Sequence, residues 1–145
     1  RPEDFPDPEG RLAGSHFIVE IPVRYKETDA AGAVYFSNHY VYFEVARTEL
    51  LRSAGLELPE LEAEGIRLPI ARAFCRYLAP ASYNDTVTVK TWIPSVRKVQ
   101  LVFRYEVARQ SDGKPIASGF TVHGCVDTFG RPAPLPVALA SLAQA

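Results

Sequence analysis

The stretch that decides the fold is Tyr25–Tyr40, with the sequence YKETDAAGAVYFSNHY. It follows a run of alternating apolar and polar residues and leads into the longest helix pattern of the chain. In its loop, Asp29 is followed by Gly32, whose missing side chain lets the backbone turn sharply. Ser37 and Asn38 stand where the helix would begin, and both residue types cap helices by accepting a hydrogen bond from a free N–H group. The stretch therefore predicts a strand, a tight loop and a capped helix in direct succession.

The residues on either side of this stretch extend both elements. Apolar residues occupy every second position over 17–25, which predicts a strand with one buried face. Pro22 lacks a backbone donor, so this strand is expected at an edge or a bulge. The helix is expected to run to about Ser53 and to be closed by Gly55, because glycine tolerates the left-handed conformation at a helix end. The first half of this helix is apolar on nearly every side, so the rest of the chain is expected to wrap it.

The second half of the chain predicts a sheet. A short helical turn is expected at 59–65, and four strands follow at 68–78, 86–93, 99–109 and 115–127. The last three are long and joined by short connections that contain Pro94-Ser95 and Ser111-Asp112-Gly113, which favours antiparallel pairing. The predicted fold class is α+β, with one curved five-stranded antiparallel sheet wrapped around one long central helix.

Length and composition favour one domain. The chain has 145 residues, of which 47% are hydrophobic and 23% charged, enough for one packed core. We expect a flexible arm over 1–14, which is rich in proline and acidic residues, a folded domain over 15–136 and a C-terminal tail over 137–145.

Charge and cysteine usage exclude several classes of protein. With a net charge of −1 and no basic stripe, nucleic acid is not an expected partner. No apolar run approaches the roughly 20 residues that span a bilayer, so no membrane span is expected. Cys75 and Cys125 lie in apolar strand patterns without metal-ligand spacing and are expected as buried free thiols, which favours a cytoplasmic location. The histidines also lack ligand spacing, so no metal site is expected.

A longer motif runs from the loop into the helix and reappears in later segments. It comprises Arg24-Tyr25, Thr28-Asp29-Ala30-Ala31-Gly32-Ala33-Val34-Tyr35, Asn38 and Phe43-Glu44-Val45-Ala46-Arg47-Thr48-Glu49, with 77–85 and 123–127 further along. This motif resembles that of the hot-dog-fold acyl-CoA thioesterases. Within them it is similar to the 4-hydroxybenzoyl-CoA thioesterase group and its Tol-Pal-associated relatives. The resemblance implies a homodimer or homotetramer that hydrolyses an acyl-CoA to the free acid and CoA, with no cofactor beyond the CoA of the substrate.

The resemblance also implies roles for individual residues. Asp29 would act on the thioester carbonyl carbon, either as nucleophile or as general base for water, while the backbone N–H of Phe36 polarises the carbonyl oxygen. A carboxylate just ahead of a helix N-terminus does lie near N–H donors that can hold an oxyanion. The resemblance places the substrate against Gly32, Val34, Tyr35 and Asn38, and the CoA phosphates against Arg97 and Lys98, often across a subunit boundary.

Other interpretations of these residues stay open. Without the motif, Asp29 would be interpreted as a turn residue that bonds its own backbone. Glu27 is expected to be a solvated charge rather than a partner of Asp29, and Asn38 to be a helix cap first. Some Tol-Pal-type relatives carry a catalytic histidine where this chain has Phe36. His39 could substitute for it, but a structural histidine with satisfied hydrogen bonds is the preferred interpretation.

Two other functions compete with hydrolysis. A hot-dog hydratase or dehydratase acting on acyl thioesters normally needs a histidine with an acidic partner, and the loop offers none between Asp29 and the helix. A non-catalytic acyl-thioester binding module would have no use for a charged Asp29 beside its pocket, where burying the charge is costly.

Overall fold

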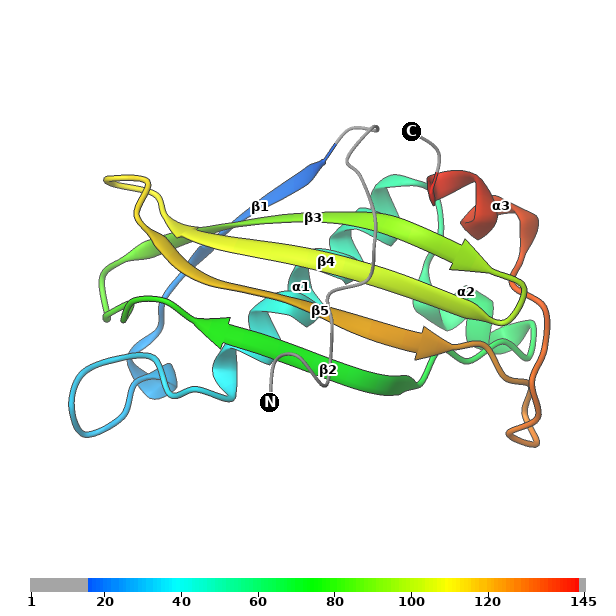
Figure 1. Cartoon of the computed structure of the whole chain (residues 1–145). Helices are drawn as coiled ribbons and strands as arrows, with labels where there is room; N and C mark the ends of the chain where they lie inside the picture. The colour runs from blue at the N-terminus through cyan, green and yellow to red at the C-terminus, as the bar shows by residue number, and fades with distance from the viewer. Residues whose placement is uncertain (1–15, 144–145) are drawn as a thin grey trace.

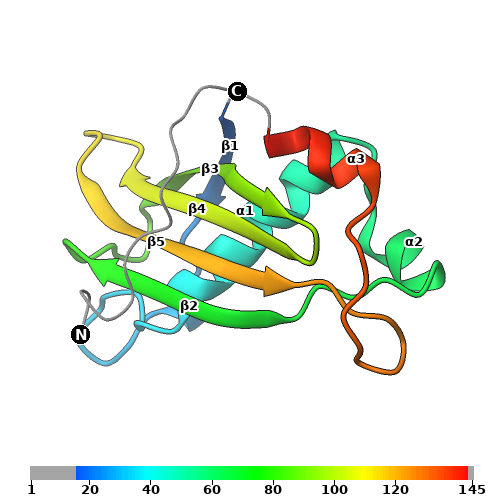
Figure 2. The same ribbon diagram turned by 45° about the vertical axis from the view of Figure 1, so that its right-hand side comes forward.

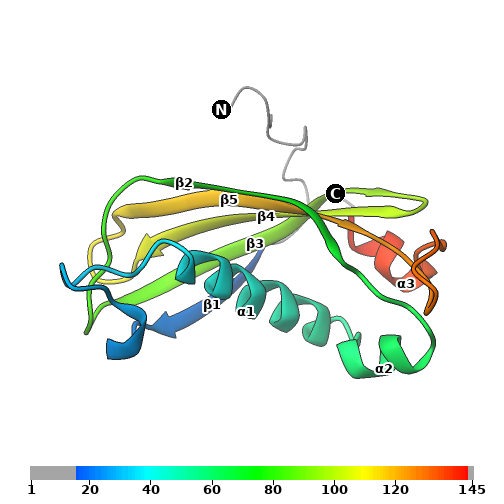
Figure 3. The same ribbon diagram turned by 90° about the horizontal axis from the view of Figure 1, so that it is seen from below.

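A computed structural model describes residues 16–143 of the chain. Its long helix α1 (Asn38–Ser53) lies along one face of a five-stranded antiparallel sheet (Figure 1, Figure 3). The order across the sheet is β1 (Phe17–Pro22), β3 (Thr86–Arg97), β4 (Gln100–Arg109), β5 (Pro115–Gly124) and β2 (Ile70–Tyr77). The predicted fold class is therefore confirmed. The arm expected over 1–14 lies outside the described residues.

An aromatic contact at the centre of α1 joins the helix to the sheet. Phe43 is fully buried, and its ring stacks on that of Tyr105 in β4, with centroids 4.2 Å apart and planes 4° apart. Gly119 of β5 lies directly beneath, where a Cβ atom would come within 2.9 Å of Phe43 Cε2. The helix can lie this close because the strand has no side chain at that point.

The sheet covers only one side of α1. The buried positions of the helix are His39, Tyr42, Phe43, Ala46, Leu50 and Leu51. Val41, on another side, is 42% exposed. The sheet covers α1 as the predicted fold class requires, but the apolar first half of the helix is not surrounded on every side within a single chain, because all five strands lie on the same side of it (Figure 3).

The start of α1 also differs from the prediction. Ser37 has helical backbone angles, φ −69° and ψ −19°, and makes no side-chain cap hydrogen bond. The Asn38 side chain donates from Nδ2 to the carbonyl oxygen of Glu27 at 2.9 Å, so it ties the helix to the preceding loop. The predicted side-chain cap is wrong. At the other end, Gly55 has φ +81° and closes the helix as predicted.

β3 continues past the point where its predicted strand ended. A register shift between Trp92 and Ser95 marks a β-bulge, and pairing with β4 then resumes as far as Arg97. Pro94 lies at this bulge, where the missing N–H does not interrupt a regular ladder. At the sheet edge, β1 ends at Pro22, which confirms the edge position expected from that proline.

Short helical segments close the end of the layer near the C-terminus of α1. They are α2 (Leu58–Ala63), α3 (Val137–Ala140) and the 3-10 turn η3 (Ser141–Ala143), and a further 3-10 turn, η2 (Tyr25–Glu27), follows β1. Figure 2 shows α3 beside the end of β3 and the last turns of α1. Leu139 of α3 is fully buried in the main core, so the stretch after residue 136 contributes to that core.

Both cysteines carry free thiols, as predicted, with Cys125 buried and Cys75 half-buried. Within residues 16–143, no helix is both long and apolar enough to cross a bilayer.

Candidate active site

The loop between η2 and α1 is a turn built around Asp29. The Asp29 N–H donates to the Ala33 carbonyl at 2.8 Å, and the Gly32 N–H donates back to the Asp29 carbonyl at 3.0 Å. Asp29 Oδ1 accepts the N–H groups of Ala31 and Ala33 at 2.9 and 3.2 Å. Gly32 has φ +86°, the left-handed conformation that favours glycine. The turn role suggested by residue type is thus present, and it occupies one carboxylate oxygen.

Two neighbouring segments hold this loop from either side. The Val34 N–H donates to the Ala81 carbonyl at 2.8 Å, and the Tyr35 N–H donates to the Glu27 carbonyl at 2.8 Å. Val34 is buried as a result, while the Tyr35 side chain is exposed. Backbone hydrogen bonds of this kind fix the position of Asp29 relative to the start of α1.

Glu27 is a buried support for the loop, which corrects the expectation of a solvated charge. The residue is only 6% exposed. Oε1 accepts the Tyr42 hydroxyl and the Arg24 N–H, each at 2.9 Å, and Oε2 accepts Arg24 Nε at 3.0 Å. Burial alone would raise the pKa of Glu27, but these hydrogen bonds outweigh it and hold the pKa below its ordinary value. The sequence pattern missed this role because Tyr42 meets Glu27 only after the chain has turned into α1.

Replacing Glu27 with glutamine should lower the free energy of unfolding by about 1–3 kcal/mol, because an amide N–H group would then face the Arg24 donors. Because the folded-state pKa is depressed, the carboxylate stabilises the fold above its unfolded pKa of about 4.3 and loses this effect as the pH falls through the folded pKa. The stability difference should therefore shrink below about pH 4. Urea unfolding at several pH values measures it. Glu57→Gln, in an exposed ion pair with Arg52, should change stability by less than about 0.5 kcal/mol.

The residues before α1 present a free backbone donor. In the first turn, the Asn38 N–H donates to the Tyr35 carbonyl at 2.9 Å and the His39 N–H to the Phe36 carbonyl at 3.3 Å. The Phe36 carbonyl also accepts the Tyr77 hydroxyl at 3.0 Å. The Phe36 N–H itself has no hydrogen-bond acceptor among the described residues. Lying at the positive end of the α1 dipole, it is suited to bind an anionic oxygen.

Asp29 and Phe36 line one cavity of about 420 Å³. The remaining lining residues are Ala33, Val34, Tyr35, His39, Tyr77, Leu78, Ala79 and Pro80. This volume lies within the range of about 300–1,000 Å³ that small-molecule sites occupy. The structure thus brings together a carboxylate residue and a residue with a free N–H group around an opening large enough for an acyl group.

Of the other residues expected at the site, some line the cavity and some lie away from it. Val34 and Tyr35 line the cavity, whereas Gly32 and Asn38 act behind it, in the turn and in the link to Glu27. The β3–β4 hairpin carries Arg97 and Lys98, and it lies at the end of the sheet opposite to the loop before α1 (Figure 1). Within one chain, these two cations are therefore not beside Asp29.

Sequence reasoning assigned no role to one wall of the cavity. That wall consists of Tyr77 at the end of β2 and of residues 78–80 beyond it. The family motif includes these residues, which was the one available signal. Their contact with the loop depends on where β2 lies in the sheet, and local sequence patterns do not specify that.

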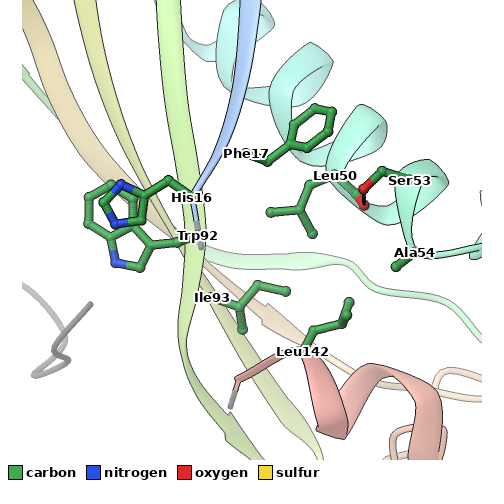
Figure 4. Close-up of a pocket in the computed structure, with 8 residues that line it drawn as sticks. All are labelled: His16, Phe17, Leu50, Ser53, Ala54, Trp92, Ile93 and Leu142. Atoms are coloured by element: carbon green, nitrogen blue, oxygen red, sulfur yellow. Dashed lines mark hydrogen bonds between the residues drawn. The ribbon is translucent and has the colours of Figure 1, made fainter. Parts of the chain in front are cut away.

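A second cavity, of about 160 Å³, lies at the other end of α1 (Figure 4). His16 stacks on Trp92 at its rim, with ring centroids 4.7 Å apart. No carboxylate is among its lining residues, and the Ser53 hydroxyl donates to the Leu50 carbonyl at 2.6 Å. This cavity therefore lacks the groups that thioester chemistry needs. Across residues 16–143, no cluster of three or more His, Cys, Asp or Glu side chains is arranged to hold a metal ion.

One sheet packed on one long helix, with a loop carboxylate and a helix N-terminus facing a shared cavity, defines the hot-dog thioesterase class. Residues 23–143 match the Thioesterase-like superfamily, and the chain belongs to this family.

Individual relatives agree with this assignment. The chain is 34% identical over 108 residues to the putative acyl-CoA thioesterase YneP of Bacillus subtilis. This alignment covers 74% of this chain and 78% of that protein. The crystal structure of the hypothetical protein TT1821 from Thermus thermophilus superposes with a TM-score of 0.81 at 37% identity, covering 87% and 98% of the two chains. Slr0204, a 1,4-dihydroxy-2-naphthoyl-CoA thioesterase from Synechocystis, gives a TM-score of 0.84 at 26% identity, covering 89% and 96%.

Proposed function

We propose that this protein hydrolyses an acyl-CoA thioester to the free acid and CoA. The observation that carries the proposal is that Asp29 and Phe36 line the same cavity, and that the Phe36 N–H has no acceptor among the described residues. The thioester carbonyl oxygen would accept a hydrogen bond from the Phe36 N–H, which is worth roughly 10²–10³ in rate at comparable sites. Asp29 Oδ2, which no described residue engages, would attack the carbonyl carbon or activate water for that attack.

The acyl group that we propose is aromatic, as in the 4-hydroxybenzoyl-CoA thioesterase group that the sequence motif resembles. Rings form much of the cavity lining, with Tyr35 and Phe36 on one side and Tyr77 at the end of β2. The Tyr35 and Phe36 rings lie 4.7 Å apart, and the Phe36 and Tyr77 rings 6.4 Å apart. Such rings favour an aromatic acyl group through offset or edge-to-face contacts. Slr0204 is named for an aromatic acyl-CoA substrate.

The proposed active unit is a homodimer, or a tetramer built from it, that forms through the edge of β2. This strand pairs only with β5, so its other edge is open. Several large apolar side chains of this strand and of the cavity are exposed, namely Tyr35, Phe36, Ile70, Tyr77 and Leu78. Exposed apolar patches of this kind mark contact surfaces, and edge pairing removes the unpaired strand groups. The free thiols also support a cytoplasmic location for this assembly.

Such a dimer would complete the site. Antiparallel pairing of two β2 strands about a two-fold axis reverses one sheet relative to the other. The Asp29 loop of one protomer would then lie at the same end as the β3–β4 hairpin of its partner. Arg97 and Lys98 could contact the CoA phosphates only from there, and guanidinium groups suit phosphate geometry.

Replacing both Arg97 and Lys98 with alanine should raise KM for acyl-CoA by about 10-fold and leave kcat unchanged, because charge-assisted phosphate contacts are lost. A mixed dimer pairs one protomer of this double variant with one Asp29→Ala protomer. One of its two sites then contains both an intact Asp29 and an intact Arg97–Lys98 pair. After subunit exchange, activity well below KM should therefore recover to about a quarter of the wild-type rate. A mixture whose activity stays at the sum of the two separate variants contradicts the composite site.

A thiol-release assay with wild-type protein tests the function directly. A panel of aromatic and aliphatic acyl-CoA esters should give free CoA, with aromatic esters turned over faster. Hydration of an enoyl thioester is the second candidate, because His39 lies in the same cavity as Asp29. Loss of enoyl absorbance without thiol release identifies that reaction. Binding of acyl-CoA by calorimetry without either reaction identifies a binding module and rejects the proposed hydrolysis.

A further inference from the structure

The face of the sheet that points away from α1 carries a row of aromatic side chains. Phe120 of β5 follows Gly119, the position that faces α1, so Phe120 points to the opposite face. The antiparallel register places Phe120 between Arg104 of β4 and Phe74 of β2. Arg104 in turn lies opposite Trp92 of β3. Four strands thus contribute one cross-strand row, which we call the outer row (Trp92, Arg104, Phe120 and Phe74).

The centre of the outer row is buried, although no described element covers it. Phe120 is fully buried, and the neighbouring cross-strand pair of Val102 and Val122 is 2% and 3% exposed. Every described helix lies on the other face of the sheet or beyond its end (Figure 3). The Arg72 guanidinium carbon is 6.0 Å from the centre of the Phe120 ring, farther than the roughly 4 Å of packed atoms. The cover of this face therefore lies outside residues 16–143.

The N-terminal segment joins the structure at one end of the outer row. His16, the first described residue, stacks on Trp92 with ring centroids 4.7 Å apart and planes 19° apart. Figure 4 shows these two rings on one side of β3, with Phe17 and Leu50 on the side of α1. Residues 1–15 therefore begin beside the outer row. Fifteen extended residues reach about 50 Å, whereas four neighbouring strands span only about 15 Å, so the segment is long enough to cross the face.

The charges of this face and of that segment are complementary. Three arginines, Arg72, Arg76 and Arg104, surround the rings of the outer row, with guanidinium carbons 5.8–6.0 Å from the ring centres. Neither Arg72 nor Arg76 forms an ion pair with a described residue. A second copy of the chain would bring two sets of arginines together, which like-charge repulsion disfavours. Residues 1–15 instead supply the apolar Phe5 and Leu12 and the carboxylates of Glu3, Asp4, Asp7 and Glu9.

We propose that residues 1–15 lie across the outer row and close this face of the sheet. The carboxylates of the segment contact the three arginines, and Leu12, four residues before His16, covers Phe120. The three prolines of the segment lack N–H groups and favour an extended conformation, so the segment lies over side chains and adds no strand. This inference is independent of the proposed hydrolysis. It leaves the open edge of β2 as the surface for assembly.

Trypsin cleavage after Arg11 tests this contact, because a docked segment is cut only when it leaves the face. Arg72→Glu/Arg76→Glu should release the segment and raise the cleavage rate by about 10-fold. Both arginines are exposed, so the variant should keep its fold. The control is Arg67→Glu/Lys114→Glu, the same charge change at exposed positions outside the strands, and it should keep the wild-type rate. An unchanged rate in Arg72→Glu/Arg76→Glu overturns the inference.

The fluorescence of Trp92, the one tryptophan of the chain, gives a second measurement that does not depend on catalysis. Deleting residues 1–14 should raise its quenching by acrylamide by about twofold, because the outer row loses its cover. The melting temperature should fall by about 2–4 °C. Quenching that stays at the wild-type level overturns the inference. Wild-type quenching that rises on dilution, together with a fall in molecular mass, shows that a second copy covers the face and also overturns it.

Discussion

Replacing Asp29 with alanine should lower kcat for acyl-CoA hydrolysis by about 10²–10⁴-fold and leave KM nearly unchanged. Among the residues that line the cavity, Asp29 carries the one carboxylate, and its Oδ2 is not engaged by any described residue. Removal therefore deletes the nucleophile or base while the Phe36 N–H and the rest of the cavity stay in place. Thiol release under saturating substrate measures the change.

A matched control exists in the turn at Asp127. There, Oδ1 accepts the N–H groups of Phe129 and Arg131 at 2.8 and 3.0 Å, and the Asp127 N–H donates to the Arg131 carbonyl at 2.8 Å. Gly130 occupies the place of Gly32, with φ +79°. Asp127→Ala thus removes the same two side-chain turn bonds away from the cavity, together with an ion pair to Arg131, and should keep wild-type kcat. If both variants lose activity equally, the Asp29 effect is one of turn geometry and the proposed chemistry is wrong.

Replacing Gly119 with alanine should lower the free energy of unfolding by more than about 3 kcal/mol, the upper end of the usual overpacking range. A Cβ atom there would lie 2.2 Å from the Phe74 carbonyl oxygen and 2.9 Å from Phe43 Cε2. Strand β2 and helix α1 would both have to shift. In a domain of this size, such a loss lowers the melting temperature by about 6–12 °C, which thermal unfolding followed by circular dichroism detects.

Gly124 provides the comparison within the same strand. A Cβ atom at this position would meet nothing within 4 Å, and the residue does not have a left-handed backbone. Gly124→Ala should therefore leave the free energy of unfolding within about 1 kcal/mol of wild type. A small increase is the expected direction, because alanine lowers the conformational entropy of the unfolded chain. Equal losses in the two variants would show that strand flexibility, rather than the contact with Phe43, accounts for the effect.

Local patterns predicted the main elements because helices and strands depend on residues a few positions apart. The alternation over 86–93 and the glycine at 55 both specified their elements correctly. Pro94 was misleading, because proline ends a regular ladder but is accommodated in a bulge, and a bulge depends on the partner strand. The predicted Asn38 cap is absent for a similar reason, since the Asn38 side chain does not accept an N–H of the helix but donates from Nδ2 to the Glu27 carbonyl in the preceding loop.

Long-range contacts limited how much of the candidate site could be predicted from the sequence. The motif around Asp29 could be identified because it is continuous in sequence. The burial of Glu27 depends on Tyr42, and the cavity wall formed by Tyr77 and residues 78–80 depends on the place of β2 beside β5. The buried Nδ1 of His39 has no hydrogen-bond partner among residues 16–143, so the interpretation of His39 as a structural histidine with satisfied hydrogen bonds is wrong. This too is a three-dimensional property, since a histidine in a helix pattern carries no sign of its surroundings.

The position of β2 in the sheet also bears on how the nascent chain acquires its activity. Its one hydrogen-bonded neighbour, β5, is synthesised only after β3 and β4, so β2 must wait unpaired while the ribosome completes them. Tyr77 and the residues beyond it cannot take their places over the loop until β5 has emerged. Chains that stall or are cut before residue 115 would therefore display an open strand to chaperones and to one another, and catalysis would begin only in molecules whose translation has passed that point.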